Sequence, residues 1–142
     1  MKIEVQVISN DIADRLKKAG EAAQIYYVSR VQAYSDKYIP FKTGTLKNTA
    51  EIGKDYILYT QPYARMHWFG KKMVDPAINA AGFLTKDGWR SRRGVKKVRT
   101  DKDLSYDGGP LRGPFWIERM WIDKHEAITR EIGNYLAREF ER

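Results

Sequence analysis

Apolar and polar positions alternate at the start of the chain and then recur at helical intervals. Over residues 3–7 every second side chain is apolar, which is the pattern of a half-buried strand. Residues 9–11 offer helix-capping side chains, and over residues 12–37 apolar side chains recur every three or four positions. This spacing predicts one long amphipathic helix, which Gly20 weakens by about 1 kcal/mol relative to alanine without ending it. Pro40 prevents the helix from continuing.

Shorter elements are predicted in the middle of the chain. Residues 40–50 indicate a loop with one helical turn, because their glycine and threonines permit tight turns and helix caps. Residues 51–60 are strand-like on both sides of Gly53–Asp55, so we expect a hairpin there. Pro62 suits the first position of a short aromatic helix that Gly70 ends.

A long excursion separates this short helix from a final one. Residues 71–113 are rich in glycine and proline and have few periodic apolar positions, so we expect a loop with one strand near residues 95–98. Pro114 opens the last helix. The predicted core face of that helix consists of Ile117, Trp121, Ile128, Ile132, Tyr135, Leu136 and Phe140. The expected fold is α+β, with long amino-terminal and carboxy-terminal helices packed on a small antiparallel sheet and a long basic loop excursion.

Length and composition limit the class of protein. A chain of 142 residues can bury one core, so we expect a single domain over residues 1–142. Apolar residues make up 42% and charged residues 31%, which excludes wholesale disorder. The apolar runs are shorter than a membrane span and the amino terminus lacks a secretion signal, so we expect a soluble chain without a membrane partner. The absence of cysteine excludes disulfides and thiolate metal sites.

The formal charge of +8 is concentrated in one segment. Residues 71–102 contain ten of the 26 basic residues against three acidic ones, a net charge of +7, and the other 110 residues carry +1. Closely spaced cations beside Trp89 suit phosphate neutralisation and base stacking, so non-specific DNA binding through residues 86–102 is one candidate function. A solvated loop is the alternative. The candidate DNA contacts are Arg90, Arg92, Arg93, Lys96, Lys97 and Arg99.

Large aromatic side chains exceed what a small core is expected to cover. Residues 115–122 are apolar on more than one side of the predicted helix, and Tyr63, Trp68 and Phe69 lie close together in the short one. Aromatic, methionine and arginine mixtures favour interface centres, so these residues predict self-association or a protein partner. The alternative is that they fill a bulky core. The candidate interface residues are Tyr63, Arg65, Trp68, Phe69, Phe115, Trp116 and Met120.

Motifs for catalysis or metal binding are incomplete in this sequence. Asp101–Gly108 begins like a calcium loop, but its glycine is two positions late and Arg112 stands where the bidentate glutamate belongs. His125 begins a helical zinc motif whose second histidine is replaced by Thr129. The glycines fit no phosphate-binding loop, and no serine lies in a nucleophile turn. We expect no catalytic residues, no metal, no cofactor and no small-molecule substrate.

One enzymatic alternative remains. The carboxylates of Asp101, Asp103 and Asp107 could serve a metal-dependent nuclease, although their neighbours Arg99 and Lys102 favour a solvated charged turn.

Three blocks, in this order and spacing, resemble the minor capsid and tail-completion proteins of tailed bacteriophages. They read YIPFKTGTLKNTA over residues 38–50, PYARMHWFG over residues 62–70 and GPFWIERM over residues 113–120. Each block alone is common among proteins, and the ordered set carries the resemblance. It spans about residues 10–140, and the basic segment is its least typical part.

The resemblance implies a non-enzymatic virion protein that forms a ring in the neck and joins the DNA-filled head to the tail. It would reside in the host cytoplasm before assembly and at the head–tail interface afterwards. Its implied partners are further copies of itself, portal or head-closure proteins, tail proteins and the packaged DNA. The resemblance also suggests a structural loop, formed by Thr43, Gly44, Thr45 and Leu46. It suggests packing or contact roles for Tyr63, Arg65, Phe115 and Trp116.

Overall fold

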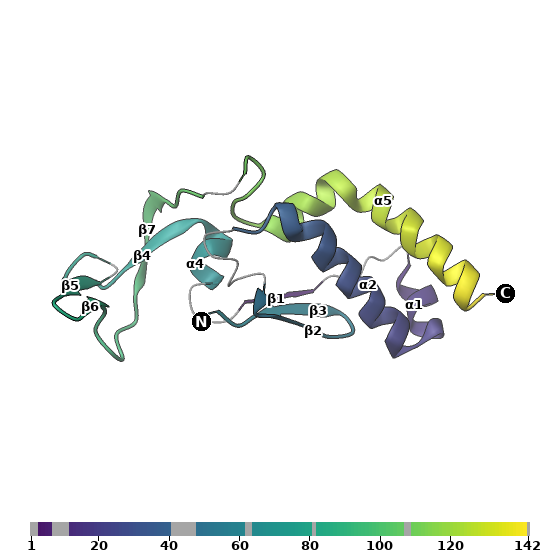
Figure 1. The fold of residues 1–142 in the computed structure, drawn as a ribbon, viewed down its shortest axis with the longest axis horizontal. Helices are drawn as coiled ribbons and strands as arrows, with labels where there is room; N and C mark the ends of the chain where they lie inside the picture. Colours follow the sequence, from purple (N-terminus) through teal and green to yellow (C-terminus); the bar gives the residue numbers. More distant parts are fainter. Residues whose placement is uncertain are drawn as a thin grey trace.

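A computed structural model describes most of the chain as a helical body with a narrow arm at one end (Figure 1). The described residues are 3–6, 12–40, 48–61, 64–80, 82–106 and 109–141. We call residues 71–103 the arm and the rest of the described chain the body. The α+β class is confirmed. No helix in these ranges is long and apolar enough to cross a membrane.

A three-stranded antiparallel sheet forms one layer of the body. It consists of β1 (Ile3–Gln6), β3 (Tyr56–Tyr59) and β2 (Ala50–Ile52), in that order across the sheet. The predicted hairpin is confirmed, since β2 and β3 pair on either side of residues 53–55. Ile57 and Tyr59 face the core and are buried. The predicted loop of residues 40–50 lies largely outside the described residues.

The amino-terminal helix is not continuous, and this part of the prediction was wrong. The structure has α1 (Ala13–Ala19), α2 (Glu21–Tyr34) and a short 3-10 turn η1 (Ser35–Lys37). Gly20 separates the two helices with φ +106° and ψ 178°, a conformation open essentially only to glycine. The helix breaks at Gly20 because glycine can adopt this backbone conformation, and not only because glycine has a low helix propensity. The break turns α1 so that Ile12 and Leu16 reach the core.

The last helix, α5 (Trp116–Glu139), follows Pro114 as predicted. It lies beside α2, which packs between α5 and the sheet (Figure 1). The contact between α5 and α2 includes stacked rings of Tyr26 and Tyr135, 4.2 Å between centroids, and an Arg30–Glu131 ion pair at 3.0 Å. The buried residues of α5 are Trp116, Ile117, Met120, Ile128, Ile132 and Leu136. Of the predicted face, Trp121 and Tyr135 are half-buried and Phe140 is exposed.

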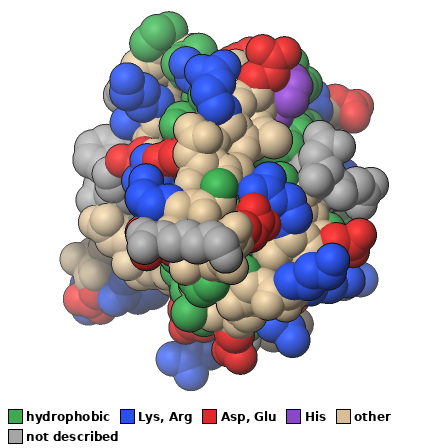
Figure 2. Space-filling view, turned by 90° about the vertical axis from the view of Figure 1, so that its right-hand side faces the viewer, with side chains coloured by type: hydrophobic (Ala, Val, Ile, Leu, Met, Phe, Trp, Pro, Cys, Tyr) green, Lys and Arg blue, Asp and Glu red, His purple; other side chains and the backbone are tan. Residues whose placement is uncertain are grey.

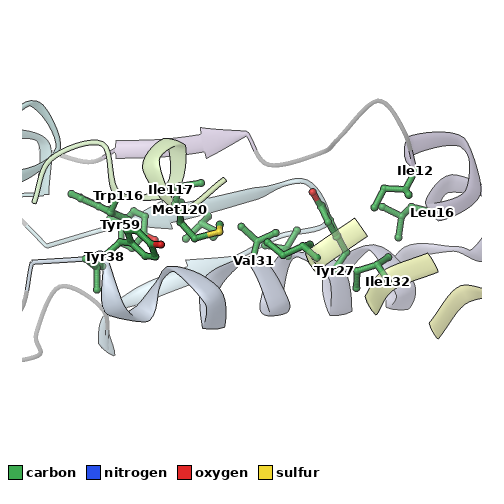
Figure 3. Packing of buried hydrophobic residues seen from close by; sticks show 14 of the residues in the cluster. Ile12, Leu16, Tyr27, Val31, Tyr38, Tyr59, Trp116, Ile117, Met120 and Ile132 are labelled. Atoms are coloured by element: carbon green, nitrogen blue, oxygen red, sulfur yellow. The ribbon is translucent and has the colours of Figure 1, made fainter. Parts of the chain in front are cut away.

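A continuous apolar core runs along the body. Figure 3 shows it extending from Trp116 and Tyr59 past Val31 and Tyr27 to Leu16. Helices on one side and the sheet on the other supply these side chains, all of them buried. The helical end of the body shows basic and acidic side chains interspersed, with scattered apolar ones (Figure 2). The described surface at that end of the body therefore mixes charges of both signs.

The excursion is an arm of short hairpins instead of the predicted loop. It begins after α4 (Ala64–Phe69), the predicted short aromatic helix, which ends at Gly70 with φ +74°. The strands of the arm are β4 (Lys71–Val74), β5 (Phe83–Thr85), β6 (Gly88–Arg90) and β7 (Val98–Asp103). They form two antiparallel pairs, β4 with β7 near the body and β5 with β6 at the far end. The predicted strand near residues 95–98 begins only at Val98.

Candidate interface on the arm

The arm carries most of the large apolar side chains that are exposed in the described chain. Among the described residues, five of the eight large apolar side chains that are exposed belong to it. These five are Ile78, Phe83, Leu84, Trp89 and Val98. The other three are Leu111, Ile122 and Phe140. Apolar residues that gather on a projecting element indicate a contact surface rather than random exposure.

Leu84 and Trp89 are the most exposed apolar residues of the arm, at 78% and 58%. They lie directly opposite each other in the β5–β6 pair, so their side chains share one face of the hairpin. The indole and strand β6 both approach the backbone at Gly82: a Cβ there would collide with Arg90 O and lie 2.7 Å from Trp89 Nε1, so this close approach requires glycine. A large ring that packs against the backbone of its own arm and is still exposed suits an interface anchor.

A buried aspartate fixes the turn that precedes the hairpin. Both carboxylate oxygens of Asp75 accept from Arg92, with Nε–Oδ2 at 2.6 Å and Nη2–Oδ1 at 2.9 Å. The backbone of Asp75 donates to Ala80 O at 2.8 Å and accepts from Asn79 N at 2.8 Å, while Ala77 N donates to Oδ1. The hydrogen bonds from Arg92 hold the pKa of Asp75 below its usual value. The turn is thereby tied to the segment between β6 and β7, which leads back from the hairpin.

Only part of the predicted cationic cluster is available to a partner. Arg92 is bound to Asp75, and the guanidinium of Arg99 lies over the ring of Phe69 at 4.1 Å. Arg90 donates to two backbone carbonyls of its own hairpin. Arg93 and Lys96 are exposed, and Lys97 is half-buried. The prediction of DNA contact therefore stays a prediction, and its strongest remaining candidates are Arg93 and Lys96.

The base of the arm is anchored on α4. Leu104 N donates to Gly70 O at 2.9 Å, and the hydroxyl of Tyr106 donates to His67 O at 2.7 Å. Burial raises the pKa of Tyr106 to about 12, so its hydroxyl stays protonated and keeps donating near neutral pH. Together with Arg99 on Phe69, these contacts fix the direction in which the arm leaves the body.

The three sequence blocks of the resemblance meet where the arm joins the body. Phe115 N donates to Trp68 O at 2.9 Å, and Gly113 N donates to Tyr38 O at 3.1 Å. The guanidinium of Arg119 donates to three carbonyls, those of Tyr38, Leu111 and Pro114. Segments that are far apart in the sequence thus form one junction that supports the arm.

Several predicted interface residues belong to the core of the body instead. Trp68, Trp116 and Met120 are buried within the chain, which corrects the expectation that they offer a free surface. The physical reason is edge-to-face ring packing, with Trp68 and Trp116 at 4.7 Å and Tyr59 and Trp116 at 5.2 Å between centroids. The aromatic residues cover one another across three elements, as the bulky-core alternative states.

The remaining predicted interface and loop residues have different positions. Phe69 and Phe115 are half-buried against the core and Arg65 is exposed, so an interface role for these three stays a prediction. Tyr63 and the predicted structural loop, Thr43, Gly44, Thr45 and Leu46, lie outside the described residues.

The carboxylates of the nuclease alternative do not form a cluster in the described part of the arm. Asp103 forms an ion pair with Lys71 across β4 and β7, and Asp107 lies outside the described residues. Within the described ranges, no group of three or more His, Asp or Glu side chains is arranged to hold a metal ion.

The sequence analysis missed Leu84 and Phe83 as surface residues, although a signal was present. Asp87–Gly88 followed by Trp89 marks a tight hairpin turn, and Gly88 has φ +108°. Asp75 also went unnoticed, because its partner Arg92 lies 17 positions away in the sequence.

Comparison with known proteins gives one match. A family model described as minor capsid protein matches residues 1–108. No curated protein and no solved structure matches the chain. The matched region includes the first two sequence blocks and the whole arm, while the third block lies beyond it.

Proposed function

We propose that this chain, which belongs to the minor capsid protein family of bacteriophages, forms a ring in the neck that joins the head to the tail. Membership of the family means that its role is structural and that it is part of the virion. Family membership implies a role without catalysis. The resemblance of the three blocks to tail-completion proteins supports the neck position, and these blocks meet in one junction.

One observation supports the ring in particular. The body buries its own aromatic residues, whereas the arm projects from one end and exposes Leu84 and Trp89. A contact surface on a projection is far from the rest of its own subunit and can bind a different surface on a neighbour. Such heterologous contacts build closed rings when the rotation between subunits closes.

Deleting the gene from its phage tests the joining role. We expect DNA-filled heads and finished tails that remain separate in electron micrographs, and joined virions once the gene is supplied in trans. Joined virions without the gene, or heads that never fill with DNA, would contradict the proposal. On the purified protein, light scattering is expected to show one discrete oligomer, alone or after addition of a neighbouring neck protein.

Non-specific DNA contact is a second candidate function, supported by the exposed Arg93 and Lys96. Binding would weaken steeply with added salt, because each neutralised phosphate releases counterions. Replacing both residues by alanine should reduce both the affinity and its salt dependence. The matched control replaces Lys17 and Lys18, two exposed cations of α1, and should change neither. Equal effects of the two double variants would exclude a DNA site on the arm.

A further inference from the structure

We propose that the far end of the arm docks on the outer face of α5 in a neighbouring copy, with one apolar contact surrounded by opposite charges. This inference rests on the proposed ring and names the two surfaces that build it. The first surface is the hairpin tip, defined as Leu84, Lys86 and Trp89. The second is the outer α5 stripe, defined as Glu118, Ile122 and Glu126.

The outer α5 stripe has an exposed apolar residue between two acids. Ile122 is 73% exposed, although it lies on a helix whose opposite side is buried. Glu118 and Glu126 are four residues before and after it, so all three side chains share one helix face. Both glutamates are exposed and form no ion pair with the residues that the structure describes.

The hairpin tip is complementary to this stripe both in its apolar surface and in its charge. Leu84 and Trp89 supply an apolar face large enough to cover one isoleucine. Lys86 lies in the turn of the same hairpin, and Arg93 and Lys96 follow close behind it, all three exposed. Cations around the apolar contact on one surface meet acids around it on the other. DNA would satisfy the cations but offers little to a leucine, which favours a second copy as the occupant.

The shape of the molecule makes this contact intermolecular. The β5–β6 hairpin lies at one end of the long axis, and β4, β7 and α4 lie between it and the start of α5, so the hairpin does not reach α5 of its own chain (Figure 1). Two different surfaces then join each pair of copies, which is a heterologous contact. Because the base of the arm is fixed on α4, the angle at which the arm leaves the body sets the rotation between copies.

Cysteine cross-linking tests the contact directly, because the chain contains no cysteine of its own. One copy carries Asp87→Cys beside the hairpin tip, and a second copy carries His125→Cys beside Ile122. Both positions are exposed and neither replaces a residue of the two surfaces. With a bismaleimide linker we expect a covalent pair between the two variants and little product from either variant alone. The control partner is Ala137→Cys, exposed on the same helix and about 18 Å from position 125 at 1.5 Å per residue.

Further variants probe the apolar contact and the charges. Adding Leu84→Asp to the arm variant, or Ile122→Asp to the helix variant, should lower the cross-linked yield about tenfold, since a charge then replaces a buried apolar contact. Glu118→Lys with Glu126→Lys should lower it as well. Lys86→Glu with Arg93→Glu in the partner copy should restore it.

Equal yields with His125→Cys and Ala137→Cys would overturn the docking proposal, as would the failure of the charge exchange to restore the product. If the purified protein still forms a ring and the deletion phage still leaves heads unjoined, the neck function stands and the ring uses other surfaces. If cross-linking succeeds but the deletion phage assembles normally, the docking contact stands and the joining function fails.

Discussion

The body and the arm place their large apolar side chains in opposite ways. In the body, Trp68, Trp116 and Tyr59 pack edge to face and are hidden from solvent. In the arm, Leu84 and Trp89 share one hairpin face and remain exposed. The body therefore derives its stability from its own core, whereas the apolar residues of the arm contribute little to the fold of an isolated chain. The difference teaches that the large apolar side chains of the sequence divide into a buried, structural set in the body and an exposed set on the arm, for which we propose a contact role.

Trp116→Ala should give the largest change in the free energy of unfolding. The side chain is fully buried between Trp68 and Tyr59, so its removal leaves a cavity and should cost about 3–5 kcal/mol. Urea denaturation of the dilute protein measures this cost. The control Ile122→Ala, on the exposed side of the same helix, should change the free energy by less than about 0.5 kcal/mol. Equal costs for the two variants would remove the distinction between core and surface on α5.

Gly20→Ala should be the next most destabilising change, at about 1–3 kcal/mol, because φ +106° with ψ 178° is strained for any residue with a Cβ. A continuous helix would predict the opposite sign, a gain of about 1 kcal/mol from better helix propensity. The sign in thermal or urea denaturation therefore decides whether α1 and α2 are separate in solution. The matched change in the arm is Gly94→Ala at φ +70°, which should leave unfolding of the body unchanged.

Acid should loosen the arm before it unfolds the body. Hydrogen bonds from Arg92 lower the pKa of Asp75 from its ordinary value of 3.8, so the stabilisation is present above that value and is lost as the pH falls through the lowered one. The N–H groups of Ala77 and Asn79 bind Asp75, so their protection against exchange, relative to an unfolded chain at the same pH, should fall in acid while amides of α5 stay protected. Asp75→Asn should show fast exchange at these amides already at neutral pH. An arm that stays protected in acid would contradict the anchoring role of this ion pair.

The sequence identified most of the helices and strands, because each depends on spacing within a few residues. The hairpin of residues 50–59, the helix before Gly70 and the start of α5 are local patterns of this kind. The junction was out of reach, since Trp68 and Phe115 meet across 47 positions of sequence and a helical pattern does not show which helix lies on which. The break at Gly20 also depends on tertiary packing, because only the fold decides whether a glycine is used as a helix residue or as a corner.

The sequence singled out the arm by its charge, whereas the exposed apolar residues on the arm were not predicted. Charge counting pointed to this segment as a candidate for DNA contact, yet it could not show that Arg92 and Arg99 contact Asp75 and Phe69. Nor could it show that Leu84 would face solvent. Burial is a property of the whole fold, so exposed and buried large apolar residues look alike in sequence.

Leu84→Ala should have the smallest effect on the fold and a large one on assembly. The side chain is 78% exposed, so the free energy of unfolding of the dilute protein should change by less than about 0.5 kcal/mol. Light scattering at higher concentration should nevertheless show loss of the ring, since the variant removes the apolar centre of the proposed contact. A loss of more than about 1 kcal/mol in unfolding would mean that Leu84 is covered by its own chain. A stable variant that assembles normally would show that the arm, although apolar and exposed, is not the surface that joins the copies.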